Sequence, residues 1–248
     1  MEGKLKEIAG ILAASASTVA LTGAGISVDS GIPAFRGSQG LWGKYDPMEY
    51  ASIEAFRGDP VRVWSMLIEL DDLVLSARPN PAHLALAQLE NLGALDMVVT
   101  QNIDGLHQEA GSRAVVEFHG SGRRLVCLEC GSYLEREQLS LEMLPPRCAC
   151  GGIIKPDVVF FGEPIPQRAM LAAMAAAQAC TAMLVVGTSA VVAPASHLPV
   201  LAQSAGARVI EINPEPTPLT GRVADLSLQA SGAEVLPVLV EMVRRIKG

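Results

Sequence analysis

Apolar residues recur at helical spacing between Leu5 and Leu12, and short apolar runs follow them along the chain. Four of these runs have the length of buried strands: 18–22, 95–100, 182–186 and 208–212. Each run adjoins a segment with helical character, and such alternation favours a mainly parallel sheet with helices on both faces. The pattern therefore predicts an α/β fold.

Small or polar residues follow each predicted strand. They are Gly23, Ala24 and Gly25 after the first run, Gln101 and Asn102 after the second, Gly187, Thr188 and Ser189 after the third, and Asn213 and Pro214 after the fourth. Open parallel sheets bind ligands outside the carboxyl ends of their strands, where such residues let the backbone approach a ligand. The sequence predicts a binding site where these four ends converge.

Capping residues and apolar stripes indicate further helices. Residues 59–77 have an apolar side, and Pro60 suits the first turn of that helix. Asn80 is expected to start the next helix, and residues 170–179 form an alanine-rich one. Cys180, which we place on the alanine-rich helix, is expected to be a small core residue.

Cysteines are concentrated in the segment 123–154, which interrupts the alternation of strands and helices. They are Cys127, Cys130, Cys148 and Cys150. Zn²⁺ binds four thiolates in a tetrahedron and then has no position for water, so the expected site is structural. Buried free cysteines are the alternative, and the second pair is separated by one residue where two are commoner. Taken alone, this segment also suggests a zinc-ribbon binding module.

The glycines after the first strand begin a dinucleotide-binding fingerprint, since glycine lets the backbone approach a pyrophosphate. Val28 stands where the full fingerprint has its third glycine, so a hydride-transferring dehydrogenase is only weakly supported. A turn that ends the strand without binding a ligand is the other alternative. Gly31, Pro33 and Gly37 predict a long loop over residues 30–40 that covers the ligand.

One of the four histidines has a distinctive place. His119 follows a short strand and precedes the cysteine segment, so it is expected to face a cleft between the two parts. His83, near a helix start, and His197 are expected to be structural. Asp104 follows the second strand end and is either a functional residue or a helix N-cap.

Composition limits the function classes. The 248 residues are 50% hydrophobic, which fits one folded domain with a small insertion. A formal net charge of -7 argues against broad capture of nucleic acid or of an anionic membrane. No apolar run reaches the roughly 18 residues of a membrane span, and residues 1–10 lack a signal-peptide pattern. Clustered cysteines suit a reducing compartment, so we expect a cytoplasmic protein.

The motifs occur together and in a fixed order. They are Gly23-Ala24-Gly25-Ile26-Ser27, Ser30 to Gly37, Thr100 to His107, Phe118-His119-Gly120, the four cysteines, Phe161-Gly162-Glu163, Gly187-Thr188-Ser189 and Ile212-Asn213. This series resembles that of bacterial and archaeal sirtuins. The resemblance implies a Rossmann-like domain over 1–119 and 156–248 and a small zinc-binding module over 120–155, to which a helical insertion at about 40–80 contributes.

The resemblance also implies the chemistry of an NAD-dependent protein lysine deacylase. The acyl-lysine carbonyl oxygen attacks the ribose carbon of NAD as nicotinamide leaves, and free lysine and O-acyl-ADP-ribose follow. His119 would be the general base for a ribose hydroxyl. Asn102 and Asp104 would position the ribose, a water or the nicotinamide amide, and Phe35 would shield the reactive carbon. An NAD-dependent protein mono-ADP-ribosyltransferase is the alternative activity.

Further site residues follow from the same resemblance. Those expected to contact NAD are Gly23, Ala24, Gly25, Ser27, Ile32, Phe35, Arg36, Gln101, Asn102, Ile103, Asp104, Gly187, Thr188, Ser189, Asn213, Pro214, Glu215 and Gly232. Those expected to contact an acyl-lysine peptide, bound as a short strand, are Val158, Val159, Phe160, Phe161, Gly162, Glu163 and Val191. Residues 158–160 would surround the acyl-lysine stem, although an ordinary buried strand also explains their pattern.

The chain departs from one branch of that family on the helix that contains Trp64. The branch that removes succinyl and malonyl groups has a tyrosine and an arginine three and six residues after this tryptophan, where this chain has Leu67 and Leu70. An acidic acyl group would lack its cation there, so we predict neutral acyl groups, acetyl first. Ala34 also stands where threonine or aspartate is frequent.

Overall fold

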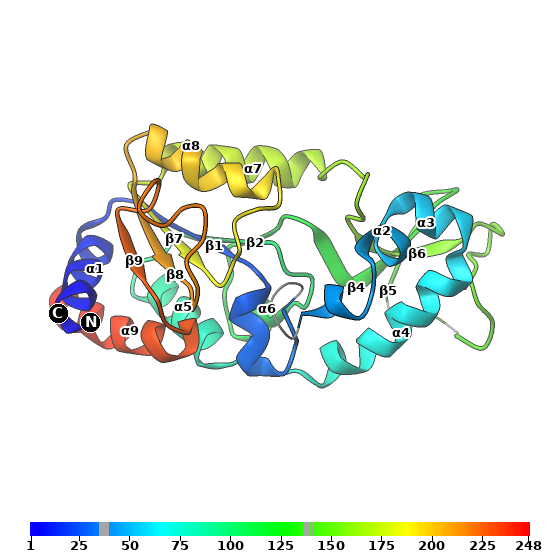
Figure 1. The fold of residues 1–248 in the computed structure, drawn as a ribbon, viewed down its shortest axis with the longest axis horizontal. Helices are drawn as coiled ribbons and strands as arrows, with labels where there is room; N and C mark the ends of the chain where they lie inside the picture. The colour runs from blue at the N-terminus through cyan, green and yellow to red at the C-terminus, as the bar shows by residue number, and fades with distance from the viewer. Residues whose placement is uncertain (35–39, 136–138, 140) are drawn as a thin grey trace.

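The computed structural model describes residues 1–34, 40–135, 139 and 141–248. Its larger part is built on a six-stranded sheet in the order β3-β2-β1-β7-β8-β9, in which every neighbouring pair is parallel (Figure 1). The strands are β1 (Thr18–Thr22), β2 (Met97–Thr100), β3 (Val115–Glu117), β7 (Ala182–Val186), β8 (Arg208–Ile212) and β9 (Leu226–Leu228). The predicted parallel α/β sheet is confirmed.

The apolar runs form strands that are buried from both sides. Every residue of β1 and of β7 is buried, and β1, β7 and β8 have the predicted bounds. The run 95–100 differs, because β2 begins only at Met97. Leu95 is a buried core residue that precedes the strand. Apolarity therefore indicates burial, whereas the strand begins where Met97 pairs with Val19 of β1.

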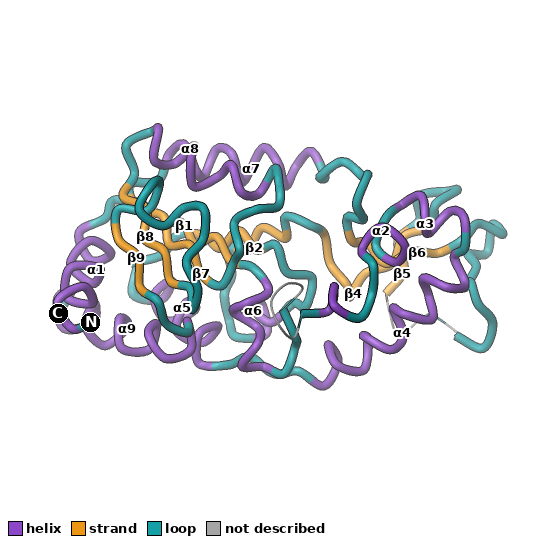
Figure 2. The backbone as a smooth tube through the Cα atoms, viewed as in Figure 1, coloured by secondary structure: helices purple, strands orange, loops and turns teal. Residues whose placement is uncertain are grey.

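Helices cover both faces of this sheet (Figure 2). One face is covered by α1 (Glu2–Ala14), α5 (Pro81–Asn91) and α9 (Gly232–Lys247), and the other by α7 (Gln167–Ala179) and α8 (Leu198–Ser204). Ile8, Leu86 and Leu239 belong to the first core, and Ala173 and Leu198 to the second. Within the described residues, no helix combines the length and the apolar character that a membrane crossing requires.

The helix predicted over 59–77 is α4 (Pro60–Ser76). Asp59 is its N-cap, and the Asp59 side chain accepts a hydrogen bond from the backbone N–H of Arg62 over 3.0 Å. The alanine-rich helix α7 begins at Gln167, three residues before the predicted start at 170. Cys180 is buried as expected, but it follows the helix as its C-cap.

A second sheet and a group of helices form the smaller part, on the right of Figure 1. Its strands are β4 (Gly120–Cys127), β5 (Tyr133–Glu135) and β6 (Ile154–Val158), which pair antiparallel in the order β5-β4-β6. The helices α3 (Ile53–Gly58) and α4 share a core with this sheet, and α2 (Pro47–Tyr50) lies beside them. Trp64 joins the two layers, since its Nε1 donates to the carbonyl oxygen of Ile154 over 2.9 Å.

The chain leaves β1 through a 3-10 helix, η1 (Ala24–Ser30). Gly31 ends this helix in a left-handed conformation, with φ of 88°, and its N–H donates to the carbonyl of Val28. Residues 32–34 and 40 have neither helix nor strand, in keeping with the predicted loop over 30–40. Phe35 and Arg36, two expected NAD contacts, lie outside the described residues. Among the described residues, the other short helices are η2 (Leu41–Gly43), α6 (Leu106–Glu109) and η4 (Ala195–His197).

Candidate active site

The carboxyl ends of β1, β2, β7 and β8 open into one pocket of about 1200 Å³, which we call the main pocket. The predicted site residues in its wall are Gly23, Ala24, Gly25, Gln101, Asn102, Ile103, His119, Val158, Val159, Phe160, Phe161, Gly162, Glu163, Gly187, Thr188, Ser189, Val191, Asn213, Pro214 and Glu215. All four polar strand ends contribute to the wall, and the end of β6 contributes from the smaller part. The strand ends therefore converge as the sequence predicts.

A second pocket, of about 130 Å³, adjoins the main pocket. Ser27, Ile32 and Asp104 line this side pocket and are absent from the wall of the main one. Much of its remaining wall is apolar and comes from α4. The two pockets share several wall residues: Ala24, Pro33, Leu67, Leu70, Asn102, Ile103 and Val158. A ligand group in the main pocket therefore has an apolar recess beside it.

Gly232, another expected NAD contact, lines neither pocket. It is the first residue of α9, where an added Cβ would lie 2.9 Å from Cγ1 of Val186. The close packing of α9 on β7 thus explains this glycine. Its neighbour Ser231 does line the main pocket and caps α9 by accepting from the N–H of Ala233.

The glycines after β1 are required because two strand-end loops touch. The N–H of Gly25 donates to the carbonyl oxygen of Gly187 over 2.8 Å. An added Cβ on Gly23 would lie 2.8 Å from Cβ of Thr188, and one on Gly25 would lie 2.7 Å from the Gly187 oxygen. Gly187 has φ of 61°, and a Cβ there would approach the nitrogen of Ile26 to 2.3 Å. Contact between the two loops is therefore sufficient reason for these glycines.

Ser27 connects η1 to the residues that follow β2. Its Oγ donates to Oδ2 of Asp104 over 2.7 Å and accepts from Nδ2 of Asn102 over 3.0 Å. Oδ1 of Asp104 accepts from the backbone N–H of Leu106 over 3.0 Å, so the same carboxylate also holds the start of α6. Ser27, Asn102 and Asp104 are all buried. Asp104 therefore lines the side pocket, whereas the N-cap interpretation is wrong, because the N-cap of α6 is Gly105 and Asp104 precedes it.

His119 lies between β3 and β4, on the wall of the main pocket. Its Nδ1 lies 3.0 Å from the carbonyl oxygen of Gln101. A carbonyl can only accept, so Nδ1 carries the ring proton and Nε2 retains its lone pair. Burial lowers the pKa of His119 below its ordinary value, although the hydrogen bond to Gln101 opposes this shift. The ring is therefore a neutral base near neutral pH.

Two further histidines, His83 on α5 and His107 on α6, are buried near Ser27 and Asp104, and their ring centroids lie 4.9 Å apart. Nδ1 of His83 accepts from the N–H of Asn80 and completes a capping box, which is a structural role as expected. Burial lowers the pKa of His83 to about 4, and the charge of Asp104 opposes this shift. Burial and the neighbouring His83 lower the pKa of His107 to about 3.

We expect the free energy of unfolding to fall as the pH drops below 6.5. The unfolded chain protonates both histidines at the ordinary pKa of 6.5, whereas the folded chain does so only near pH 4 and pH 3. Acid therefore favours the unfolded state. The stability that the two neutral histidines contribute is fully present above pH 6.5. Below that pH, each histidine lowers the free energy of unfolding by up to about 1.4 kcal/mol per pH unit. Urea unfolding followed by circular dichroism, at neutral pH and at about pH 5, measures the slope.

Two substitutions separate this contribution from that of other groups. His107→Asn should flatten the slope, because the variant has one buried histidine fewer. His197→Gln should leave the slope unchanged, because that side chain is exposed. An identical slope in the His107→Asn variant would contradict the prediction.

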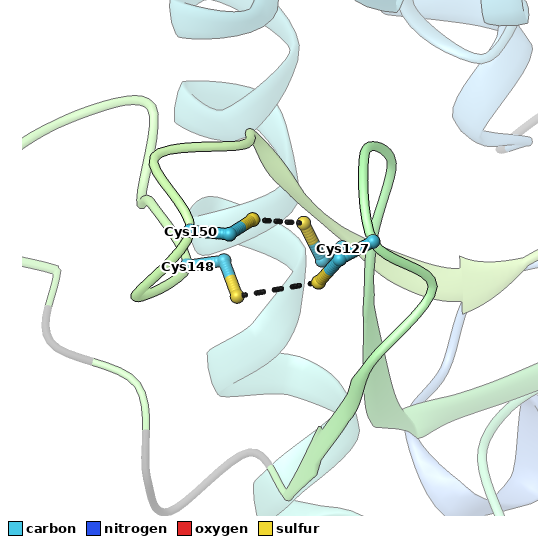
Figure 3. A group of neighbouring side chains, drawn as sticks. Cys127, Cys148 and Cys150 are labelled. Carbon is cyan, nitrogen blue, oxygen red and sulfur yellow. Dashed lines mark hydrogen bonds between the residues drawn. The ribbon is translucent and has the colours of Figure 1, made fainter.

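The four predicted cysteines meet at the end of β4, whose last residue is Cys127. All their Sγ atoms lie within 4.8 Å of one another, with 3.5 Å between Cys127 and Cys150 and 3.8 Å between Cys130 and Cys148. Figure 3 shows Cys148 and Cys150 facing the end of β4 that carries Cys127. Sulfurs bound at about 2.3 Å to a tetrahedral Zn²⁺ lie about 3.8 Å apart, so this cluster fits the ion. The single-residue spacing of the second pair does not prevent this arrangement.

The family model of the Sir2 family matches residues 23–194, which are more than half of the chain. The chain is also 51% identical to "NAD-dependent protein deacylase 2" of Pyrobaculum aerophilum, over 239 residues that are 96% of this chain and 95% of the relative. The chain belongs to the Sir2 family. The resemblance drawn from its motifs is confirmed.

Solved structures of other sirtuins have the same fold as this one. A mutant of a Sir2 homologue in complex with ADP ribose matches with a TM-score of 0.94 and 44% identity, over 97% of this chain and 96% of that one. A mutant Sir2 with a deacetylated p53 peptide and 3′-O-acetyl ADP ribose matches with a TM-score of 0.91 and 36% identity, over 96% and 97% of the two chains. Both resemblances extend over nearly the whole molecule.

Sequence reasoning missed several polar residues that shape this sirtuin's site. Thr22 and Thr100 end adjacent strands in register, and Oγ1 of Thr22 donates to Oγ1 of Thr100 over 2.9 Å. Nε2 of His107 lies 2.9 Å from the same Thr22 oxygen. Gln101 was expected, but its bond from Nε2 to Oγ1 of Thr188, over 3.0 Å, was not. The available signal was a polar residue at the end of an otherwise apolar run.

Another missed residue is Glu211, which is buried in β8. Its carboxylate accepts hydrogen bonds from the hydroxyls of Thr217 and, over 2.6 Å, of Thr220. These bonds order the loop after β8, which lines the main pocket. Within that loop, Nδ2 of Asn213 donates to the carbonyl oxygen of Glu215 over 2.6 Å. The available signal was a glutamate inside an otherwise apolar run.

Proposed function

We propose that this chain is an NAD-dependent protein lysine deacylase, which cleaves NAD to nicotinamide and transfers the acyl group of an acyl-lysine to ADP-ribose. The observation that carries the proposal is the neutral base His119 on the wall of the main pocket. Two comparisons support it: the relative named NAD-dependent protein deacylase and the Sir2 complex that contains a deacetylated peptide with an acetyl ADP ribose. The proposed substrates are NAD and an acyl-lysine protein or peptide.

His119 has the geometry of a general base in this reaction. NAD supplies a ribose carbon that exchanges nicotinamide for an acyl oxygen, and a ribose hydroxyl must then lose its proton. Nε2 of His119 would accept that proton. The hydrogen bond from Nδ1 to the carbonyl of Gln101 holds the ring in the required tautomer, and the carbonyl dipole stabilises the charge that the ring gains.

The residues proposed to hold NAD lie on the facing loops of the main pocket. The phosphates and riboses would bind along the touching loops 23–25 and 187–189, and the adenosine would bind beside Asn213. Asn102 and Asp104, both held by Ser27, would position the ribose, a water or the nicotinamide amide. Phe35, which is proposed to shield the reactive carbon, lies outside the described residues.

The acyl-lysine peptide is proposed to add as a short strand between residues 158–163 and residues 191–193. The first of these segments is held on its other side by backbone hydrogen bonds. The N–H of Val159 donates to the carbonyl of His119 over 2.9 Å, and the N–H of Phe161 donates to that of Ala51 over 2.8 Å. Backbone pairing carries little sequence information, so broad tolerance of peptide sequence is expected.

The acyl group is proposed to face α4. Leu67 and Leu70, at the positions where the desuccinylating branch has tyrosine and arginine, line both pockets. The described wall of the side pocket contains no lysine or arginine, and its one acidic residue is Asp104. An acidic acyl group would lose its water there without gaining a cation. The site therefore favours neutral acyl groups, acetyl first.

We expect kcat/KM for an acetyl-lysine peptide to exceed that for the same peptide with succinyl-lysine by about 10²-fold or more, because the succinyl carboxylate is desolvated without a partner. The variant Leu67→Tyr with Leu70→Arg supplies a hydroxyl and a cation and should narrow this ratio. Leu75→Arg on the same helix is the control, since Leu75 is exposed and lines neither pocket. Desuccinylation by the parent enzyme at the rate of deacetylation would refute the assignment.

Mass spectrometry of the peptide tests the proposed function. The enzyme is incubated with NAD and an acetyl-lysine peptide, and the peptide is weighed before and after. Loss of an acetyl group, dependent on NAD, is the expected result. A gain of ADP-ribose on the peptide would instead indicate mono-ADP-ribosyl transfer. If the peptide is unchanged and NAD is not cleaved, the proposed function is wrong.

Two further parts of the proposal concern the whole molecule. We place the enzyme in the cytoplasm, because thiols that bind zinc must stay reduced. We also propose that the chain divides into a Rossmann-like domain, 1–119 and 156–248, and a small zinc-binding module, 120–155. A helical insertion at about 40–80 contributes to the small module. The apolar core shared by α3, α4, β4 and β6 is separate from the two cores of the large sheet, which supports this division, and the small sheet itself extends to Val158.

A further inference from the structure

Lys155, on β6, carries a buried charge that the proposed mechanism does not use; its side chain is 5% exposed. Its Nζ donates to the carbonyl oxygen of Val158 over 2.6 Å and to that of Pro156 over 3.1 Å. The same Nζ lies 3.0 Å from Oε2 of Glu163 and 4.7 Å from the ring centre of Phe160. An ammonium has three N–H donors, and these three oxygens satisfy them. The bonds therefore define one arrangement of the surrounding chain.

Glu163 closes the turn that follows β6. Its Oε2 also accepts from the backbone N–H of Phe160 over 2.9 Å, and its own N–H donates to the Phe160 carbonyl over 2.9 Å. Gly162 has φ of 88°, a left-handed conformation that glycine adopts readily. The side chains of Lys155 and Glu163 thus tie the two ends of the segment 156–163 together through one ion pair.

This segment forms part of the main pocket. Residues 158–163 line it, whereas Lys155 is not among the described residues of its wall. The backbone bonds from Val159 and Phe161, described above, hold the segment against His119 and against Ala51 at the end of α2, but neither bond holds the turn at Gly162. Lys155 therefore acts on the pocket through the segment that it folds.

We propose that Lys155 and Glu163 are positioning residues for the acyl-lysine peptide, an inference that rests on the proposed deacylase function. A peptide that adds as a strand needs backbone partners at fixed spacing. A receiving segment with several conformations binds more weakly, because only the fraction of molecules in the competent conformation accepts the peptide. The proposed NAD loops lie on other strands, so the effect of the pair falls on the peptide and not on the nucleotide.

The test is the double variant Lys155→Met with Glu163→Gln. Methionine keeps the apolar stem, and glutamine keeps an acceptor for the Phe160 N–H. Removing both charges avoids an unpaired buried charge, which would destabilise the fold. We expect KM for an acetyl-lysine peptide to rise about ten-fold, on the scale of one or two lost hydrogen bonds, while kcat and the Kd for ADP-ribose stay within about two-fold.

Steady-state kinetics, calorimetry with ADP-ribose and thermal unfolding are measured on the same preparations. Lys6→Met, which removes the exposed ion pair with Glu2 on α1, is the control and should leave all three unchanged. Glu163→Gln alone keeps the acceptor and loses only the charge, so it should raise the peptide KM by a smaller factor. If the double variant does not fold, the peptide KM of the Glu163→Gln variant tests the inference, and an unchanged KM would overturn it.

The outcomes separate this inference from the function on which it rests. An unchanged peptide KM in a folded variant would overturn the inference, and so would an equal rise in the peptide KM and in the Kd for ADP-ribose, because a general structural defect moves both. Absence of deacylation by the parent enzyme would instead overturn the proposed function. Parent activity is therefore measured first.

Discussion

Replacing His119 by alanine is expected to lower the rate of peptide deacetylation by about 10²-fold or more, the usual scale for losing a general base. The bond from Nδ1 to the Gln101 carbonyl makes Nε2 the proton acceptor, and alanine supplies no substitute. Binding of ADP-ribose should change little, because all proposed nucleotide contacts except the ribose hydroxyl at Nε2 come from other residues of the main pocket. Product formation, followed by chromatography of the peptide, and calorimetry with ADP-ribose measure the two effects.

The control for this prediction is His197→Ala, at an exposed histidine outside both pockets. The pH profile gives a second check. Burial places the pKa of His119 below 6.5, so the acid limb of kcat/KM, which reports the free enzyme, should lie below that pH in the parent enzyme. A His119→Ala variant that deacetylates the peptide at the parent rate would remove His119 from the mechanism.

Replacing Cys148 by serine is expected to abolish tight zinc binding and to unfold the zinc-binding module. Structural zinc sites contribute about 10–16 kcal/mol of apparent binding free energy, and in such modules this energy is folding energy. The proposed module also contains β4, and β6 begins in it and ends in the wall of the main pocket, so deacylation should be lost as well. Zinc content by atomic absorption and thermal unfolding measure the change.

Cys180→Ala is the matched control, because this thiol is buried in the second core of the large sheet, away from the cluster. It should retain about one zinc per chain, the occupancy of a single four-sulfur site. Chelation of zinc from the parent enzyme should reproduce the effect of Cys148→Ser. A Cys148→Ser variant with unchanged zinc content and unfolding temperature would show that the cluster is not a zinc site.

The central strands and the pocket were predictable because their signals are local. A run such as 182–186 is apolar throughout since both faces of β7 are covered, and the polar residues after it mark the open end of the sheet. The four cysteines were predictable because the spacing of thiolates along the chain reflects the tetrahedron that they form. These patterns require no knowledge of distant contacts.

The polar networks were not predictable, because their partners are far apart in the sequence. Ser27 and Asp104 are separated by 77 residues, and only the parallel pairing of β1 with β2 brings them together. Lys155 also has an ordinary sequence context, and its burial depends on how the turn before Glu163 folds over it. Side-chain partners of this kind follow from tertiary packing, which periodicity does not describe.

The glycines show a second limit of sequence reasoning. The approach of a pyrophosphate stays a prediction for Gly23 and Gly25, and the structure adds a second reason for both glycines, the contact with Gly187 and Thr188. The NAD contact of Gly232 stays a prediction, and the structure shows that this glycine also packs on Val186 at the start of α9. A glycine shows that space is restricted, and the sequence alone does not identify the neighbour.

Quantifying all products of one reaction tests the central claim, that the enzyme breaks the bond between ribose and nicotinamide in order to accept an acyl group. Parent enzyme is incubated with NAD and an acetyl-lysine peptide, and nicotinamide, deacetylated peptide and acetyl-ADP-ribose are measured by chromatography and mass spectrometry. Equal amounts of the three, without reduced nicotinamide, are expected. Reduced nicotinamide, or deacetylated peptide with free acetate and intact NAD, would contradict the claim.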